Sequence, residues 1–372
     1  MKPSLSHRER VRLALDHRPT DRVPIALICA GINKPVREAA DALLRRTRGV
    51  SLDAYLAPLI DVREVAPPYV GPPLADGADI WGVRRRPVSY GAGEYMEIDR
   101  YPLAEARTLD DLRHHAWPRP EWFDYSVLPG RIAALQADGE FATIVYNGNP
   151  FETSWYMRGL ERMMTDLALD ADFARELLAR VTDFHVEFFR QVLAAGRGRI
   201  DLIFTADDIG GQEGLLMSLD MWERFLKPCH VRLNQAIHEF GAKAVYHSDG
   251  AIMEAVGGLI DMGIDVLQAL QFDARRMDPA ILKALHGRRL CFAGGVSVQK
   301  TLPFGTSEDV RREVRRLISV LGAGGGYILG PSHAIQAGTP PENVLALFDE
   351  AARVGMQKER AETIPRATRP SA

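Results

Sequence analysis

Eight short apolar segments recur along this chain, and most of them show no alternation of apolar and polar residues. They lie at residues 25–29, 56–60, 143–146, 202–204, 244–246, 266–270, 290–292 and 327–329. Strands that are buried on both faces of a parallel sheet have this composition. Helical patterns separate the later segments, as repeated strand–helix units require. The pattern predicts an α/β protein built as a single (βα)8 barrel over residues 1–358.

Three further segments depart from this repeat. Residues 6–17 have the pattern of an amphipathic helix, and Ser6 and Glu9 form a capping box at its start. Residues at about 78–100 are predicted to form an inserted β-hairpin, because two strand-like runs flank the turn sequence Tyr90-Gly-Ala-Gly93. Residues 359–372 are polar and predict a flexible tail. An open sheet that binds dinucleotides is disfavoured, since no Gly-x-Gly-x-x-Gly follows an early strand.

Composition excludes several classes of function. The chain has 372 residues and a net charge of −3, which does not favour a nucleic-acid surface. No apolar run approaches the roughly 20 residues of a membrane span. The three cysteines, Cys29, Cys229 and Cys291, are far apart and form no Cys-x-x-Cys. A disulfide framework is therefore not expected, and a reducing cytoplasm suits the chain.

His247 and Asp249 follow the predicted strand at 244–246 directly. Residues two apart in extended chain point to the same side, so both side chains could reach one atom. The carboxyl ends of parallel strands carry the chemistry of barrel enzymes. Comparable polar or glycine positions follow or flank the other strands, and we take them as candidate substrate-binding or catalytic residues: Asn147, Glu152, Asp207, Asp208, Gln212, Gln268, Gly294 and His333.

Structural roles compete with these interpretations. Asp207 or Asp208 could cap the next helix, and Gln212 could also be a cap. Asn147 could simply form a turn. His247, Asp249 and His333 together would offer two imidazoles and one carboxylate, a set that suits Zn²⁺ with an open position and also non-haem Fe²⁺. The alternative for the two histidines is substrate hydrogen bonding or a structural role.

The chain resembles the uroporphyrinogen decarboxylase superfamily, which includes corrinoid-dependent methyltransferases. The likeness runs from about residue 6 to 355 and depends on the order of several motifs. They are residues 6–18 with Asp21-Arg-Val-Pro24, Leu160-Glu-Arg-Met163, Asp207-Asp-Ile-Gly-Gly-Gln212, Phe292-Ala-Gly-Gly-Val296 and Gly330-Pro-Ser-His-Ala-Ile335. The resemblance implies a (βα)8 barrel with its site at the carboxyl mouth. It also leaves a homodimer open.

Two features distinguish the branches of this superfamily. Porphyrinogen decarboxylases carry an arginine-rich segment after the first strand, and residues 29–37 lack that pattern. The methyltransferase branch binds zinc through His-x-Cys after strand five and a Cys after strand eight. Those positions correspond here to His247, Asp249 and His333. Only the histidine at 247 matches, so the resemblance implies a harder metal site with fewer thiolates.

The leading hypothesis is a methyltransferase or demethylase that moves a methyl group from a small methoxylated substrate to a corrinoid protein. Zn²⁺ on the predicted ligands, or Asp249 as general acid, would assist departure of the oxygen. Glu152, Asp207 and Gln212 would orient the substrate. A partner must supply the corrinoid, because the chain has no Asp-x-His-x-x-Gly motif. The alternatives are a metal-free lyase acting on an acidic substrate, with Asp249 or the 207–208 pair stabilising a cation, and a non-catalytic tetrapyrrole-binding protein.

Overall fold

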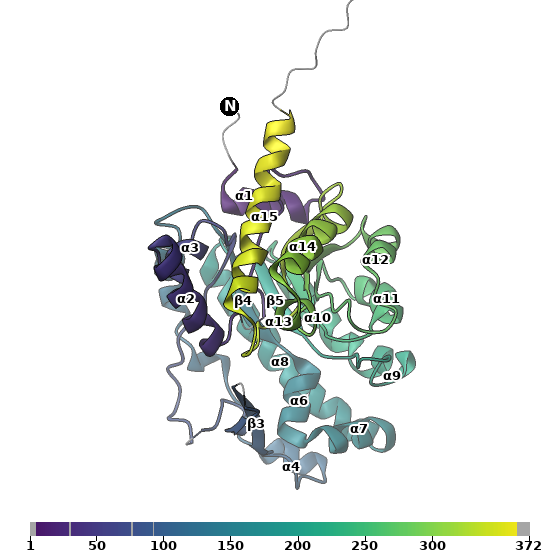
Figure 1. Cartoon of the computed structure of the whole chain (residues 1–372). Helices are drawn as coiled ribbons and strands as arrows, with labels where there is room; N and C mark the ends of the chain where they lie inside the picture. Colours follow the sequence, from purple (N-terminus) through teal and green to yellow (C-terminus); the bar gives the residue numbers. More distant parts are fainter. Residues whose placement is uncertain (1–4, 30, 76, 92, 363–372) are drawn as a thin grey trace, which may run out of the picture.

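The computed structural model describes residues 5–29, 31–75, 77–91 and 93–362 (Figure 1). Within them, seven parallel strands form one curled sheet in the order β1-β4-β5-β6-β7-β8-β9. Their bounds are β1 (Val62–Glu64), β4 (Ala142–Gly148), β5 (Leu202–Ala206), β6 (Lys243–His247), β7 (Val266–Ala269), β8 (Cys291–Val296) and β9 (Tyr327–Pro331). Six of the eight predicted strands coincide with or overlap β4 to β9. The predicted α/β barrel architecture is confirmed.

Residues 24–26 occupy the place of an eighth strand between the two edges of the sheet. Ile25 pairs in parallel with Leu329 of β9 as an isolated bridge. The N–H of Ala26 donates to the carbonyl of Leu329 at 2.9 Å. On the other side, the N–H of Asp61, just before β1, donates to the carbonyl of Ile25 at 2.8 Å. These backbone hydrogen bonds close the ring of strands.

Two predicted strands differ from the structure. The segment at 25–29 makes only the single bridge at Ile25, and it ends at Cys29, whose left-handed backbone with φ 67° departs from extended structure. The prediction of a strand at 56–60 is wrong. Leu56 is the last residue of a short helix, α3 (Leu52–Leu56), and residues 57–59 form the turn after it; the N-cap hydroxyl of Ser51 accepts the N–H of Ala54. Leucines at i and i+4 form the buried face of this helix, a spacing that fits a helix and not a strand.

Helices surround the sheet in the order of the chain (Figure 1). The α-helices besides α3 are α1 (His7–Leu15), α2 (Lys34–Arg48), α4 (Leu109–His114), α5 (Leu128–Leu135), α6 (Pro150–Arg158), α7 (Leu160–Leu169), α8 (Ala171–Gly196), α9 (Leu219–Phe225), α10 (Lys227–His238), α11 (Val256–Asp261), α12 (Pro279–His286), α13 (Thr301–Phe304), α14 (Ser307–Leu321) and α15 (Pro341–Glu362). Short 3₁₀ turns are η1 (Pro120–Trp122), η2 (Tyr125–Val127) and η3 (Met253–Ala255). Each described helix is too short or too polar to cross a lipid bilayer.

Helix α1 closes the end of the barrel where the strands begin. The predicted capping box at its start is present, with Ser6 and Glu9 bonding reciprocally. Val11 of α1 packs into the same apolar cluster as the inward-facing side chains of the strands, among them Ile144, Phe204 and Ile328. The interior of the barrel is therefore a packed core, and α6, which directly follows β4, marks the opposite, carboxyl end (Figure 1).

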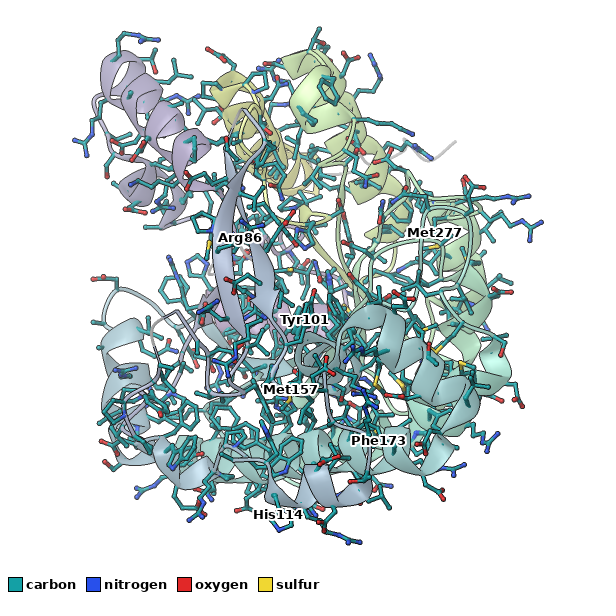
Figure 2. The ribbon with its side chains drawn as sticks, turned by 90° about the horizontal axis from the view of Figure 1, so that it is seen from below. Arg86, Tyr101, His114, Met157, Phe173 and Met277 are labelled. Carbon is teal, nitrogen blue, oxygen red and sulfur yellow. The ribbon has the colours of Figure 1, made fainter. Side chains whose placement is uncertain are left out.

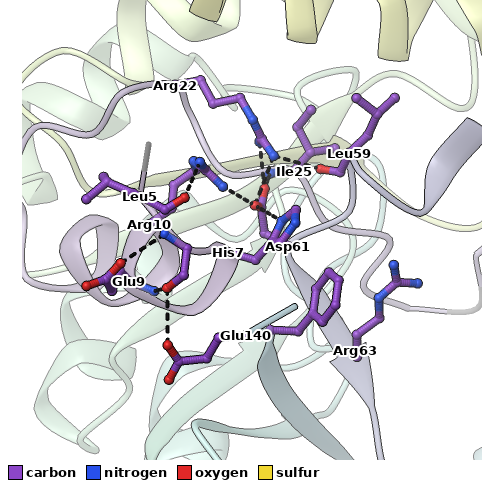
Figure 3. A network of polar contacts seen from close by, with 12 residues as sticks. Leu5, His7, Glu9, Arg10, Arg22, Ile25, Leu59, Asp61, Arg63 and Glu140 are labelled. Carbon is purple, nitrogen blue, oxygen red and sulfur yellow. Dashed lines mark hydrogen bonds and ion pairs between the residues drawn. The ribbon is translucent and has the colours of Figure 1, made fainter. Parts of the chain in front are cut away.

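A buried carboxylate, Asp61, ties α1 to the point of ring closure (Figure 3). Arg10 of α1 donates to its Oδ1 at 2.7 Å, and Arg22 donates to its Oδ2 at 2.7 Å. The ring of His7 lies 2.8 Å from Oδ1, and the N–H of Ile25 donates to Oδ2 at 2.7 Å. Burial by itself raises the pKa of Asp61, but these partners outweigh it and hold the pKa below its ordinary value.

The predicted inserted hairpin is confirmed, as strands β2 (Arg84–Ser89) and β3 (Glu94–Arg100) pair antiparallel. In the view from below, the hairpin lies across the end of the molecule, with Arg86 labelled on β2 (Figure 2). A Cβ built at Gly93 in its turn would lie 2.8 Å from Cβ of Ala337, in the loop after β9. The guanidinium of Arg85 stacks 5.0 Å from the ring of Tyr156 in α6. The hairpin therefore borders the carboxyl mouth.

The C-terminal helix α15 includes the first four residues of the predicted tail and ends at Glu362. The rest of that predicted tail, 363–372, lies outside the described residues. The division into a barrel domain over 1–358 and a tail stays a prediction.

Candidate active site at the carboxyl mouth

The ends of β6 and β7 and the loop after β9 meet through two side chains and one backbone carbonyl. Nδ1 of His247 lies 2.5 Å from Oε1 of Gln268. Nε2 of Gln268 donates to the carbonyl oxygen of Ser332 at 3.3 Å, which fixes the orientation of the amide. His247 and Gln268 are buried. Since an amide oxygen only accepts, Nδ1 carries the proton of the neutral ring, and in that tautomer Nε2 of His247 has the free lone pair.

Two further side chains approach His247. The ring centroid of His333 lies 5.7 Å from that of His247. One ligand atom each from Cys29, His247 and His333 lies within 4.8 Å of the others. Burial, with the carboxylates of Asp249 and Asp208, raises the pKa of the Cys29 thiol to about 12. Burial also lowers the pKa of His333, although the neighbouring carboxylates oppose that shift.

A second group of potential ligands shares His247. Oδ1 of Asp208 lies 3.6 Å from Nε2 of His247 and accepts the N–H of Asp249 at 2.7 Å. Ligand atoms of Asp208, His247 and Asp249 all lie within 4.8 Å of one another. Burial and the charge of Asp208 raise the pKa of Asp249, whereas His247 and His333 lower it. This shift is in the direction that a proton donor requires.

The sequence predicted His247, Asp249 and His333 as one ligand set. The structure brings all three to the same mouth, divided between the two overlapping groups. Sequence reasoning missed Cys29, which it considered only for disulfides. Cys29 ends the first apolar segment, so the strand-end rule that singled out the other candidates could have found it.

Asp207, predicted to orient the substrate, has a fully buried side chain. Its two oxygens accept the N–H groups of Phe151 and Glu152, at 3.0 and 2.7 Å, at the start of α6. Nε2 of His230 lies 2.6 Å from Oδ2. Burial raises the pKa of Asp207 against the opposing effect of these partners. Asp207 therefore caps α6, the helix before it in the chain and not the next one, and positions Glu152.

Glu152 lies in the first turn of α6 and is itself buried. Nδ2 of Asn149 donates to one of its oxygens at 2.7 Å, and the hydroxyl of Tyr156 lies 3.1 Å from the other. Burial, together with the charges of Asp208 and Asp207, raises the pKa of Glu152 to about 7. A carboxyl group poised near neutrality can donate or accept a proton.

The remaining predicted residues differ in exposure. Asn147 is exposed at the end of β4 with φ 98°, a turn-like conformation. Gln212 is exposed after β5, and its carbonyl accepts the N–H of Arg275 at 2.9 Å. A Cβ at Gly294 would lie 2.9 Å from the carbonyl oxygen of Ala269, so close strand packing already explains this glycine. Substrate contacts for Asn147, Asp208, Gln212, Gln268 and Gly294 stay predictions.

Comparison with known sequences places this barrel in a family. Residues 86–354 match the family described as uroporphyrinogen decarboxylase (URO-D). The chain belongs to the uroporphyrinogen decarboxylase family. Members of this family are enzymes, and those similar to this chain have two kinds of name. A uroporphyrinogen decarboxylase of Syntrophotalea carbinolica is 25% identical over 59% of this chain and 62% of its own length.

A methylated-thiol–coenzyme M methyltransferase of Methanosarcina mazei is also 25% identical, over 62% of each chain. The matches to these two relatives therefore span less than two thirds of their length. A solved structure of a methyltransferase from Methanosarcina mazei superposes with a TM-score of 0.65 at 19% identity, covering 94% of this chain and 99% of that one. That likeness shows a shared fold over the whole barrel.

Proposed function

We propose that this protein transfers a methyl group from a small methoxylated compound to a corrinoid held by a separate protein. The observation that carries the proposal is the convergence of His247, His333, Asp249 and Cys29 at one barrel mouth. The family includes methyltransferases, as the similar protein of Methanosarcina mazei illustrates. Imidazole, thiolate and carboxylate are the groups that hold Zn²⁺ with an open position.

The reaction requires a leaving oxygen to be stabilised. The C–O bond of the methoxy group breaks, its electron pair stays on oxygen, and cobalt(I) of the partner supplies the pair for the new cobalt–carbon bond. Where Asp249 does not bind the metal, its carboxyl group would deliver a proton to the departing oxygen, and burial raises its pKa in the direction that this role requires. Glu152 would hold the substrate, and Asp207 would hold Glu152 in place.

A divalent metal would assist by neutralising charge on the departing oxygen. The residues predicted for it are His247, Asp249 and His333, and His247 lies in two groups whose nitrogen, sulfur and oxygen atoms suit such an ion: one with Cys29 and His333, and one with Asp208 and Asp249. Gln268 fixes the proton of His247 on Nδ1 and so leaves the other nitrogen able to bind a cation.

The charged residues at 29–37 argue against a porphyrinogen substrate. A tetrapyrrole with many carboxylates requires several free cations. Lys34 pairs with Glu38 on the exposed face of α2, at 3.9 Å, and Arg37 pairs with Asp53. Both cations of the segment at 29–37 therefore have acidic partners.

The second candidate is a metal-free lyase that acts on another acidic substrate. The observation that favours it is Glu152, whose pKa of about 7 suits proton transfer without a metal. Several relatives are named uroporphyrinogen decarboxylase, including one of Thioalkalivibrio sulfidiphilus that is 23% identical over 94% of this chain and 98% of its own.

The test combines the purified protein, a reduced corrinoid protein and a panel of methoxylated aromatic compounds. We expect conversion of cobalt(I) to methylated cobalt, followed by its absorbance, and loss of this activity after chelation with recovery on adding Zn²⁺. Asp249→Ala and His333→Ala should abolish transfer, whereas Asp53→Ala, on the surface, should retain it. Full activity in both site variants would contradict the mechanism. Release of CO₂ from an acidic substrate, indifferent to chelators, would support the lyase.

A further inference from the structure

We propose that Cys29 is a metal ligand and that it forms, with His247 and His333, a site for Zn²⁺ or a similar divalent transition metal. Cys29 ends the segment at 25–29, His247 ends β6, and His333 lies in the loop after β9, so the three are far apart in the sequence. This proposal concerns the metal of the proposed function and rests on that function for its catalytic role. The existence of the site itself depends only on the three side chains.

The three side chains lie close enough together to share one metal ion. One ligand atom from each of the three residues lies within 4.8 Å of the other two, so a small movement of side chains would bring all of them to one ion. His247 is buried, and Cys29 and His333 are half-buried, which restricts access of water. A catalytic zinc site has three protein ligands of this kind and one open position.

The contacts of His247 orient its ring to act as a metal ligand. Metal-bound histidines usually donate their other N–H to a carbonyl, carboxylate or water. The contact of Nδ1 with Oε1 of Gln268, at 2.5 Å, is an arrangement of this type. Gln268 is held in turn by Ser332, which directly precedes His333. One hydrogen-bond chain therefore orders both histidine-bearing segments.

The backbone at Cys29 has an unfavourable conformation. Its φ of 67° is uncommon for a residue with a side chain and costs free energy. The N–H of Gly31 donates to the carbonyl of Cys29 at 2.9 Å, which holds this tight turn. Strain of this kind persists where the surrounding structure requires a side chain in one place.

The identity of the third ligand decides which ions the site prefers. A thiolate with two imidazoles favours Zn²⁺ and Co²⁺ over Mg²⁺ and Ca²⁺. The competing group of Asp208, His247 and Asp249 offers two carboxylates and would favour harder ions. With Cys29 as ligand, Asp249 stays free of the metal and available as a proton donor.

Cobalt substitution separates these assignments without any activity assay. Co²⁺ bound by a thiolate has a sulfur-to-cobalt charge-transfer band in the near ultraviolet, and Co²⁺ bound by oxygen and nitrogen alone has none. We expect the wild-type protein to bind Co²⁺ with this band. Cys29→Ser should lose the band and more than roughly tenfold in affinity, the lower limit for loss of even an outer partner. Cys229→Ser, at a buried cysteine in α10, should keep both.

The charge-transfer band should not depend on Asp249. Asp249→Asn should retain the band. A band that persists in Cys29→Ser, or Co²⁺ binding without a band in the wild-type protein, would overturn the proposal. If Cys29→Ser does not fold, alkylation of the wild-type protein serves instead, because bound Zn²⁺ should protect Cys29 and chelation should expose it. Equal alkylation with and without Zn²⁺ would also overturn it. A clear band without methyl transfer would contradict the proposed function alone.

Discussion

The amide of Gln268 determines which nitrogen of His247 is available to a ligand. Its oxygen lies 2.5 Å from Nδ1 of His247, while its nitrogen donates to the carbonyl of Ser332. The amide cannot rotate without losing both contacts. In the neutral ring, Nε2 of His247 is therefore the nitrogen with a free lone pair, and it lies 3.6 Å from the carboxylate of Asp208.

Removal of this amide should weaken metal binding. In Gln268→Leu, the proton of His247 loses its acceptor and the ring its orientation, so we expect affinity for Zn²⁺ to fall about 10- to 100-fold. Gln268→Glu keeps an acceptor at the same place and should bind Zn²⁺ more tightly than the leucine variant. Titration against a chromophoric chelator measures both. Equal affinity in the wild-type and leucine proteins would show that Gln268 has no such role.

Asp207 and Asp208 are adjacent, but truncation should cost very different amounts of stability at the two positions. Asp207→Ala leaves two backbone N–H groups and His230 without their buried partner, and we expect a loss of about 3–5 kcal/mol of unfolding free energy. The carboxylate of Asp208 is 39% exposed, so Asp208→Ala should cost only about 1 kcal/mol. Urea unfolding measures both. Similar losses in the two variants would contradict the capping role of Asp207.

The contrast between these two aspartates shows what the sequence could predict. Their position after an apolar strand indicated the barrel mouth, because that inference requires only the strand and its direction. Which carboxylate faces the core depends on the backbone after the strand ends, where the two-residue alternation no longer applies. Both the capping and the substrate-binding interpretations were therefore open.

The composition of each strand explains which strands the sequence predicted and which one it missed. Strands β4 to β9 are apolar enough to be recognised, since both faces are buried. β1 consists of Val62, Arg63 and Glu64, and its two charged residues at the sheet edge hide it from a search for apolar runs. Cys29 was missed for a different reason, because its thiol was considered only for disulfides, although it ends an apolar segment as the other candidates do.

Glu152 should make the stability of the protein depend on pH near neutrality. Its pKa rises from 4.5 to about 7 on folding, so the folded state retains a proton that the unfolded state has released between these values. Stability is therefore lost as pH rises through this window, by roughly 3 kcal/mol at about 1.4 kcal/mol per pKa unit. Glu152→Gln removes this loss. It should be more stable than the wild-type protein at about pH 8 and nearly equal to it at about pH 4.5.

Urea unfolding at the two pH values measures this difference. Glu213→Gln, at a side chain that is 83% exposed, is the matched control and should change stability by less than about 0.5 kcal/mol at either pH. A constant difference between Glu152→Gln and the wild-type protein across this range would show that Glu152 does not titrate as described.

Asp61 should contribute stability at neutral pH that disappears in acid. Its pKa is held below the ordinary value because His7, Arg22 and Arg10 outweigh the effect of burial. The contribution is present above the unfolded pKa near 3.8 and is lost as pH falls through the lower folded pKa. Asp61→Asn leaves Arg10 and Arg22 without a buried anion, so we expect a loss of about 3–5 kcal/mol at pH 7.

Asp61 lies where the ring of strands closes, so the loss of stability in Asp61→Asn also tests how the barrel closes. Its backbone N–H and one carboxylate oxygen both bond to Ile25, and its carbonyl accepts the N–H of Ala142 in β4 at 3.1 Å. Asp53→Asn, at a carboxylate that is 79% exposed, should change stability by less than about 0.5 kcal/mol. Hydrogen exchange should then show faster opening of the amides of Ala26 and Leu329 in Asp61→Asn, because these amides join the closing segment to β9. Unchanged exchange at both amides would mean that the ring closes without help from this carboxylate.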